Sequence, residues 1–134
     1  MNASDDIRDA LLALPAVTAI VGSGATARIW SDWQRTYTVP CIIIDIDKEE
    51  EQNDLTGKAG GLVVADVTLT CRESTETLRE VLRQAVRSGL SGYSGTFDGI
   101  LDDTQNAAVP KDDGSDGHWY DAVMSFTMLW QEAV

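Results

Sequence analysis

The sequence predicts an α+β fold: a mixed, mainly antiparallel sheet of four to five strands with helices packed on one face. Predicted strands outnumber predicted helices, several strands are joined by short hairpin connections, and the helices are amphipathic. The 134 residues, 43% of them hydrophobic, fit a single domain over 1–134. A chain of this size buries enough apolar surface to fold without metals or disulfides.

Two short helical segments are predicted at the N-terminus. Ser4 is a favourable N-cap, and Asp5 and Asp6 follow it where the positive end of the helix dipole stabilises negative charge. The first helix carries one apolar stripe, formed by Ile7, Ala10, Leu11 and Leu14. A second helix is expected over 15–21, because its proline suits the first helical position and Gly22 can end it.

Two strands and a long connection should follow. A short strand is predicted over 28–33 and a firmer one over 37–46, in which Ile42, Ile44 and Ile46 share a face. Residues 48–61 are almost free of apolar side chains and end in turn formers. We therefore expect an exposed connection there, between two antiparallel strands.

The next strand and helix are the clearest elements. Residues 62–71 alternate in polarity, with Val63, Ala65, Val67, Leu69 and Cys71 on one side. Ser74 or Thr75 then caps a helix that Gly89 is placed to end. The stripe that this helix should bury against the sheet is Leu78, Val81, Leu82, Ala85, Val86 and Leu90.

Two further strand segments complete the predicted sheet. A strand over 96–101 and 105–109 is expected to be interrupted near Asp102 and Asp103. A long closing strand is predicted over 119–131. One of its faces carries Tyr120, Ala122, Met124, Phe126, Met128 and Trp130.

Charge and composition exclude several classes of protein. The chain has 22 acidic and 10 basic side chains, a net charge of −12, which repels nucleic-acid phosphates and anionic lipids. Its apolar runs are too short to span a bilayer, and its N-terminus has acids where a secretory signal needs basic residues. We therefore expect no membrane association and synthesis in the cytoplasm. Cys41 and Cys71 fall in predicted strands and are expected to be buried small hydrophobes.

The sequence contains no recognisable catalytic constellation. Nucleophile-elbow, phosphate-loop and dinucleotide motifs are missing, and the single histidine, His118, has no marked nucleophile. Residues 112–117 resemble part of a calcium loop, but Gly114 and Val123 occupy positions that need oxygen ligands. We expect a polar turn there, no metal, no cofactor and no enzymatic activity.

A row of arginines on the predicted 74–90 helix is the most distinctive charged feature. Arg79, Arg83 and Arg87 lie four residues apart, a like-charge spacing that Glu76 and Glu80 partly relieve. The row is either a solvated helix face or a contact for the acidic 48–61 connection of a neighbouring subunit. The acids of that connection that would take part are Glu49, Glu50, Glu51 and Asp54.

The order of elements resembles a known family. The segments that carry the likeness are DALLALPAVTAIVG, ARIW, VPCIIIDI, LVVADVTLTCRES, TLREVLRQAVRSGL and HWYDAVMSFTMLWQ. In this order they resemble the tail completion or tail terminator proteins (minor tail protein U-like) of long-tailed bacteriophages and related particles. The likeness covers nearly the whole chain, and rests on features such as the helix ending in VG and the proline before the second strand.

The resemblance implies a structural protein of the virion. Such a subunit would form a hexameric ring at the head-proximal end of the tail tube, end tail polymerisation and join the tail to the head. The implied partners are further copies of the chain, the tail tube protein and a head-completion or neck protein. DNA would only pass through, past an acidic inner wall that repels it; which acids face that channel stays open.

Two other functions are compatible with the sequence. A head-closure or neck adaptor of the same particle is the nearest alternative. An acidic DNA-mimic inhibitor, which would occupy the cleft of a nucleic-acid-binding protein, belongs to a different class. In a ring each subunit needs two different complementary patches. Strand edges and the 48–61 connection are the candidates for them, because both can order on assembly.

Overall fold

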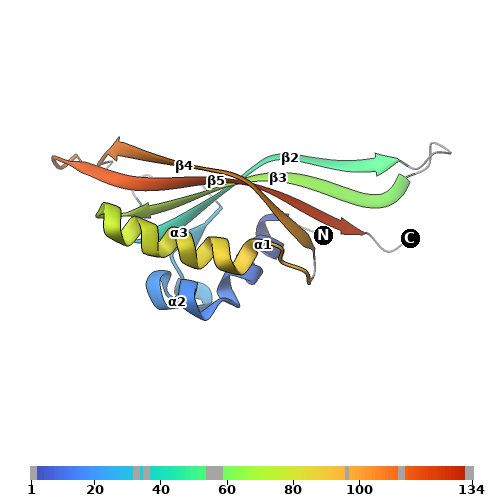
Figure 1. Cartoon of the computed structure of the whole chain (residues 1–134), viewed down its shortest axis with the longest axis horizontal. Helices are drawn as coiled ribbons and strands as arrows, with labels where there is room; N and C mark the ends of the chain where they lie inside the picture. Colours follow the sequence, from blue (N-terminus) through green and yellow to red (C-terminus); the bar gives the residue numbers. More distant parts are fainter. Residues whose placement is uncertain are drawn as a thin grey trace.

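A computed structural model of the chain describes residues 3–31, 34, 37–53, 59–95, 97–111 and 114–131, with the backbone alone for 49–53, 59–62, 130 and 131. It contains a five-stranded sheet with helices packed against one face (Figure 1). The predicted α+β class is confirmed. In Figure 1 the helices lie below the sheet, and the upper face of the sheet has no helix over it.

The N-terminal helices are α1 (Ala3–Leu12) and α2 (Pro15–Val21), followed by a 3₁₀ turn, η1 (Gly24–Thr26). The prediction that Ser4 is the N-cap is wrong. Ala3 is already helical and only 2% exposed, so its burial in the core places Ser4 inside the first turn. The bounds of α2 are as predicted, and Gly22 ends it at a φ of 92°, which favours glycine.

The strands lie in the order β1-β2-β3-β5-β4. Their bounds are β1 Ile29–Trp30, β2 Cys41–Asn53, β3 Ala59–Glu73, β4 Asp98–Pro110 and β5 His118–Gln131. β1 is parallel to β2, and every other pair is antiparallel. In the described part of the first predicted strand, 28–31, only residues 29 and 30 are strand, and 32 and 33 lie outside the described residues. The second predicted strand begins only after Pro40, which has no N–H to donate.

The expected connection over 48–61 is largely strand, and this prediction is wrong. β2 continues to Asn53 and β3 begins at Ala59, so that Lys48 pairs with Asp66 and Gln52 with Leu62. The polar end of β2 stays in the sheet because its backbone pairs with β3, a strand with several β-branched residues. β3 in turn pairs with β5. Only 54–58, which include Asp54, lie between the strands, outside the described residues.

Helix α3 spans Glu76–Leu90 and packs beneath the sheet (Figure 1). Thr75 is its N-cap, with its Oγ1 accepting the Leu78 N–H at 3.2 Å. Gly89 does not end the helix as predicted, because it lies inside the last turn. A Cβ at this position would collide with the Leu14 side chain, so the glycine permits close packing against the start of α2.

The predicted apolar stripe of α3 is wider than the face that it buries. Leu82, Val86 and Leu90 are buried, whereas Leu78 and Val81 are 45% and 53% exposed. The sheet covers only one side of the helix. Val81 lines a groove shared with α2, and Leu78 is exposed to solvent.

The last two strands agree with the predicted pattern. β4 is continuous, and the predicted interruption is a bulge at Asp102, between the paired residues Leu101 and Asp103. On β5 the predicted face is buried at Ala122, Met124, Phe126 and Met128. Tyr120 is partly buried, and the Trp130 side chain lies outside the described part of the chain.

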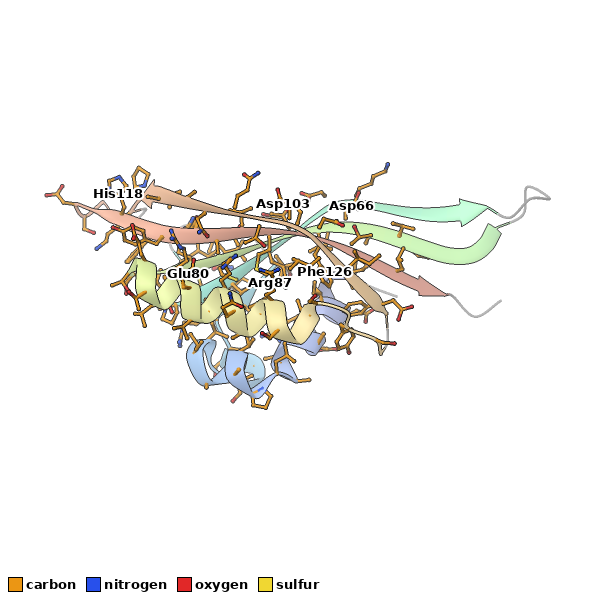
Figure 2. All side chains as sticks on the ribbon, viewed as in Figure 1. Asp66, Glu80, Arg87, Asp103, His118 and Phe126 are labelled. Carbon is orange, nitrogen blue, oxygen red and sulfur yellow. The ribbon has the colours of Figure 1, made fainter. Side chains whose placement is uncertain are left out.

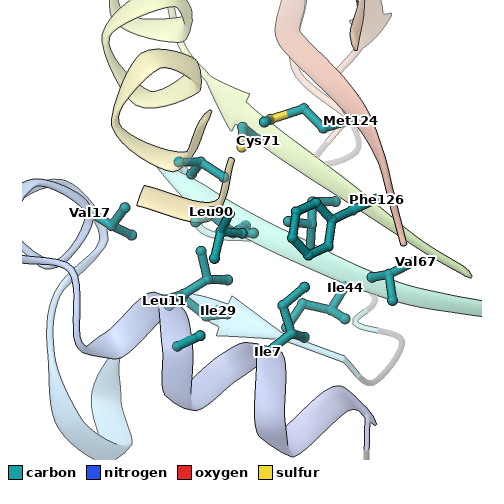
Figure 3. Close-up of a cluster of buried hydrophobic side chains, with 14 of the residues drawn as sticks. Ile7, Leu11, Val17, Ile29, Ile44, Val67, Cys71, Leu90, Met124 and Phe126 are labelled. Atoms are coloured by element: carbon teal, nitrogen blue, oxygen red, sulfur yellow. The ribbon is translucent and has the colours of Figure 1, made fainter. Parts of the chain in front are cut away.

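The core lies between the helices and the lower face of the sheet (Figure 3). It joins Ile7 and Leu11 of α1 and Leu90 of α3 to Ile44 of β2 and Phe126 of β5. Cys41 and Cys71 are buried, as predicted, and neither forms a disulfide. Burial raises the pKa of the Cys71 thiol, so this residue behaves as an apolar core side chain.

Candidate assembly surfaces

The arginine row of α3 is largely used within the chain. Arg83 Nη1 pairs with Glu80 Oε2 at 2.8 Å, and Arg79 Nε lies 3.7 Å from Glu80 Oε1. The Arg79 guanidinium also sits 5.9 Å from the Tyr120 ring centroid. The Arg79 and Arg83 side chains are only 12% and 19% exposed, so neither is a solvated surface group. Arg87 is the exposed member of the row.

A polar notch separates the α3 arginines from strand β4. It has a volume of about 280 Å³ and is lined by Arg83, Arg87, Leu101, Asp102, Asp103 and Thr104. The Glu80 side chain also accepts a hydrogen bond from Asn106 Nδ2 of β4 at 3.4 Å. The carboxylates nearest the arginine row in the described chain therefore come from α3 and β4 of the same subunit.

The predicted pairing of the arginine row with Glu49, Glu50, Glu51 and Asp54 is an intersubunit hypothesis, which one chain does not test. Within the subunit, Glu49–Glu51 lie on β2, separated from β4 by β3 and β5. Their side chains and Asp54 lie outside what the structure describes. Of the seven candidate residues, Arg87 is the one with a described, exposed side chain.

The helix-free face of the sheet carries a band of carboxylates, which we call the acidic face. Its members are Asp45, Asp47, Asp66, Asp102 and Asp103, all exposed. Strand register places Asp45, Thr68, Ser125 and Asp103 in one row across β2, β3, β5 and β4. Figure 2 shows Asp66 and Asp103 on the side of the sheet away from Glu80 and Arg87.

Hydroxyl groups between the strands hold several of these carboxylates in place. Thr68 Oγ1 donates to Asp47 Oδ2 at 2.5 Å, and Thr127 Oγ1 donates to Asp102 Oδ2 at 2.7 Å. Thr127 also lies 3.5 Å from Asp66 Oδ1. Threonine hydroxyls leave the negative charge of the carboxylates uncancelled. The acidic face is therefore a preorganised band of negative charge.

Sequence reasoning found only parts of the acidic face. Asp45 and Asp47 are close together in the sequence, and so are Asp102 and Asp103. Asp66 alternates with the apolar residues of β3, which was the available signal. The register that brings strands from both halves of the chain together depends on tertiary pairing, which periodicity does not encode.

A partly buried ionic cluster occupies one end of the same sheet. Arg72 Nε and Nη2 donate to the two carboxylate oxygens of Asp121 at 2.9 and 3.0 Å. The Tyr37 ring lies 5.7 Å from the Arg72 guanidinium. Glu73 is 4% exposed, and its burial raises the pKa of that carboxyl, although the Ser74 N–H bond and the Arg28 charge oppose the shift. The Arg72–Asp121 pair links β3 to β5.

An apolar groove lies between α2 and α3, on the helix side of the sheet. It measures about 510 Å³, and its walls include Leu14, Ile20, Val81 and Ala85. Val81 and the nearby Leu78 are two of the three large hydrophobic side chains that are strongly exposed among the described residues. The third, Ile100, lies on β4.

The described residues contain no group of three or more side chains arranged to hold a metal ion. The calcium-like stretch falls partly outside that set, because 112 and 113 are not described. His118 is exposed at the start of β5 (Figure 2). None of the helices in the described ranges has the length and apolar character needed to cross a membrane.

Comparison with known proteins adds no family. No protein-family model matches the chain, and no curated protein matches it either.

Proposed function

We propose that the protein is a structural subunit of a phage-type particle, forming a ring at the head-proximal end of the tail tube. In this role it ends tail polymerisation, supplies the surface that joins the tail to the head, and catalyses no reaction. The sequence resemblance suggests this function. The observation that carries it further is the acidic face, a helix-free band of exposed carboxylates on a sheet whose other face is covered by helices.

The acidic face suits the wall of a channel through which DNA passes. Phosphates are repelled by five exposed carboxylates, and repulsion along the wall lets a polyanion move without being trapped. Few described cations lie near these carboxylates. Arg72 is paired with Asp121, and Lys48 is one positive charge opposite Asp66. Arg83, which is paired with Glu80, and Arg87 line the notch beside Asp102 and Asp103, below the face itself. We therefore place this face towards the lumen and the helices towards the outside of the ring.

The subunit also offers the unlike surfaces that a ring requires. Head-to-tail contacts join two different patches of each copy. At one edge of the sheet, α3 and β4 present the exposed Arg87 beside the polar notch. Towards the other edge lies the acidic strand β2. Strands β2 and β3 extend beyond the helix layer (Figure 1), so this second edge can contact a neighbouring copy.

Immunogold labelling of purified particles tests the proposed location. Antibody against this chain should label one end of isolated tails, the end opposite the host-binding tip. Label along the whole tube, on the capsid shell or nowhere on the particle would contradict the proposal. A neck adaptor would instead leave isolated tails unlabelled and label the heads at one vertex.

The acidic face also favours a second candidate of a different class, the DNA-mimic inhibitor. Regularly placed carboxylates can occupy the basic cleft of a nucleic-acid-binding protein. This function requires a basic partner that binds the purified chain and is released by salt. Recovery of such an enzyme, with no virion association of the chain, would favour the inhibitor over the ring subunit.

A further inference from the structure

Two long strand edges have no neighbouring strand in the described part of the chain. β1 pairs with β2 only at Ile42 and Ile43, so the outer edge of β2 is open over 44–53. At the opposite edge of the sheet, β4 is the last strand. Its start is covered, because Asp98 bridges Ser94 and the Gly99 N–H donates to the Tyr93 carbonyl, and its outer edge is open over 100–110. Open edges present backbone N–H and C=O groups to any strand that approaches.

The two edges are protected to different degrees. β2 carries Asp45, Asp47 and Glu49–Glu51 and has a register shift at Asp47, features that discourage pairing between like edges. β4 is protected at its start by Asp98 and the bulge at Asp102, and at its end by Pro110. Between them, Thr104–Val109 has no charge, no proline and no bulge.

Hydrogen bonds show which backbone groups of this segment are available. Asp103 Oδ1 accepts the Thr104 N–H at 2.8 Å, so that N–H points outward from the sheet and is already occupied. Because the direction alternates along an antiparallel strand, the N–H groups of Asn106 and Ala108 point outward too. Among described residues, no backbone group outside β5 is bonded to 104–109.

Resting on the proposed ring, we propose that 104–108 of β4 pairs with the open β2 edge, 44–53, of the next copy of this chain. Charge selects this pairing over the others. Two β2 edges would bring acids against acids, whereas 104–108 carries no charged side chain to oppose the carboxylates of β2. Pairing of two β4 edges would close after two copies and leave the β2 edges open.

The topology gives this contact the correct strand direction. β2, β3, β5 and β4 are successive antiparallel neighbours, so β4 runs opposite to β2. A copy related by rotation about an axis along the strands keeps its strand directions, and its β2 therefore arrives antiparallel to β4. The same rotation keeps every acidic face on the same side of the wall.

The required stagger is compatible with a closed sheet. Within one subunit, Thr104 is level with Ile44, so 104–108 must slide along the neighbouring β2 to pass its β1. A slide of about four residues is roughly 14 Å, and four strands are roughly 19 Å wide. The strands would then tilt by about 35°, which is within the range of closed sheets.

Disulfide trapping tests the contact in the purified chain. With the stagger above, Ala107 of one copy lies opposite Asp45 of the next. The variant carrying both Asp45→Cys and Ala107→Cys should, under mild oxidation, form a ladder of covalent multimers longer than dimers. Within one chain the two sites are three strand spacings apart, more than the roughly 7 Å limit for a disulfide. Gln105→Cys and Val109→Cys, each with Asp45→Cys, cover a shift of register.

Each outcome of the trapping experiment either supports or contradicts the proposed contact. A ladder from a double variant, with at most dimers from either single variant, supports the contact. Monomers and dimers only, from all three double variants with native circular dichroism, would overturn it. Efficient dimers from Ala107→Cys alone, without a ladder from the double variant, would replace it with a β4–β4 contact. A ladder of multimers, together with particles that the immunogold antibody does not label, would support the edge contact and contradict the tail function.

The sign of an added charge gives a second, independent readout. Gln105→Glu places a like charge against the acidic β2 edge and should reduce the Asp45→Cys, Ala107→Cys ladder at least fivefold. Gln105→Lys should leave the ladder intact or strengthen it. Ala19→Glu, an exposed position on α2, is the matched control and should have no effect. Equal loss with Glu and Lys would contradict pairing with an acidic edge.

Discussion

Glu73 is a carboxylate held at the end of β3 with 4% exposure. Burial raises its pKa, so the folded state binds the proton more tightly than the unfolded state does. The stability linked to this proton is complete below the ordinary carboxyl pKa, and is lost as the pH rises through the raised value. At neutral pH the charged form therefore weakens the fold.

Glu73→Gln keeps an acceptor for the Ser74 N–H, which now lies 3.3 Å from the carboxylate, and removes the buried charge. We expect a melting temperature a few degrees above wild type at pH 7, with the difference vanishing below about pH 4. Thermal unfolding followed by circular dichroism across this range measures it. Asp98→Asn, at an exposed position, should show no such pattern. A lower melting temperature for Glu73→Gln at pH 7 would contradict the assignment.

The Arg72–Asp121 pair is the strongest ionic contact described. Both bonds are short, and the two side chains are 14% and 5% exposed. Asp121→Ala would leave the guanidinium without its partner and should cost about 3 kcal/mol in the free energy of unfolding. Urea denaturation gives this value. Arg72→Met combined with Asp121→Leu should recover most of the loss; a double variant as unstable as the single would show that packing dominates.

Local rules predicted residues whose role depends on near neighbours. The Thr75 cap and the Gly22 stop were predictable because they concern one turn of backbone. Gly89 was misassigned as a helix end because its function depends on Leu14, which is distant in sequence. Burial of Glu73 and Asp121 had no local signal either, since these residues lie on strands that pair across a long separation in sequence, with Arg72 opposite Asp121 and Glu73 opposite Tyr120.

At the scale of elements, the packing of α3 against the start of α2 depends on the lack of a side chain at Gly89. Gly89→Ala should lower the free energy of unfolding by about 1–2 kcal/mol, because the overpacking cost exceeds the gain in helix propensity. Adding Leu14→Ala to this variant should reduce the cost of the added methyl group. Chemical denaturation of the single and double variants measures both effects.

The neighbouring Ser88→Ala is the control for helix propensity, because Ser88 is exposed on the same turn. It should be neutral or slightly stabilising. If Gly89→Ala is equally neutral, the close approach of Leu14 does not limit the packing of the two helices.

Strand pairing explains which elements the sequence predicted well. The alternation of β3 and the buried face of β5 were visible because both strands face the core on one side. The polar end of β2 looked like a loop because its own side chains give no strand signal. Its structure comes from the backbone ladder to β3, which a composition-based reading of one segment cannot detect.

For the whole molecule, the net charge of −12 includes the band on the helix-free face of the sheet. If this face lines a channel, neutralising it should make the wall retain DNA. We expect particles with Asp45→Asn, Asp66→Asn and Asp103→Asn to form in normal number but to eject DNA more slowly, with infectivity reduced about tenfold or more. Particle counts by electron microscopy and triggered DNA release separate assembly from ejection.

The matched control neutralises three acids on the helix side, with Asp5→Asn, Asp6→Asn and Asp9→Asn on α1. These variants should release DNA at the wild-type rate. Equal slowing by both triple variants would show that net charge, and not the acidic face, controls release. A particle structure with the acidic face on the outer rim would remove the lumen assignment altogether.

Tail length in the absence of this chain tests the proposed function most directly. The gene is removed from its particle-producing source, and the lysate is imaged by negative-stain electron microscopy, with complementation by the wild-type gene as control. A tail terminator predicts overlong tails and unattached heads, both restored by complementation. Tails of normal length on intact, infectious particles would contradict the structural function, and normal-length tails without heads would assign the chain to the neck.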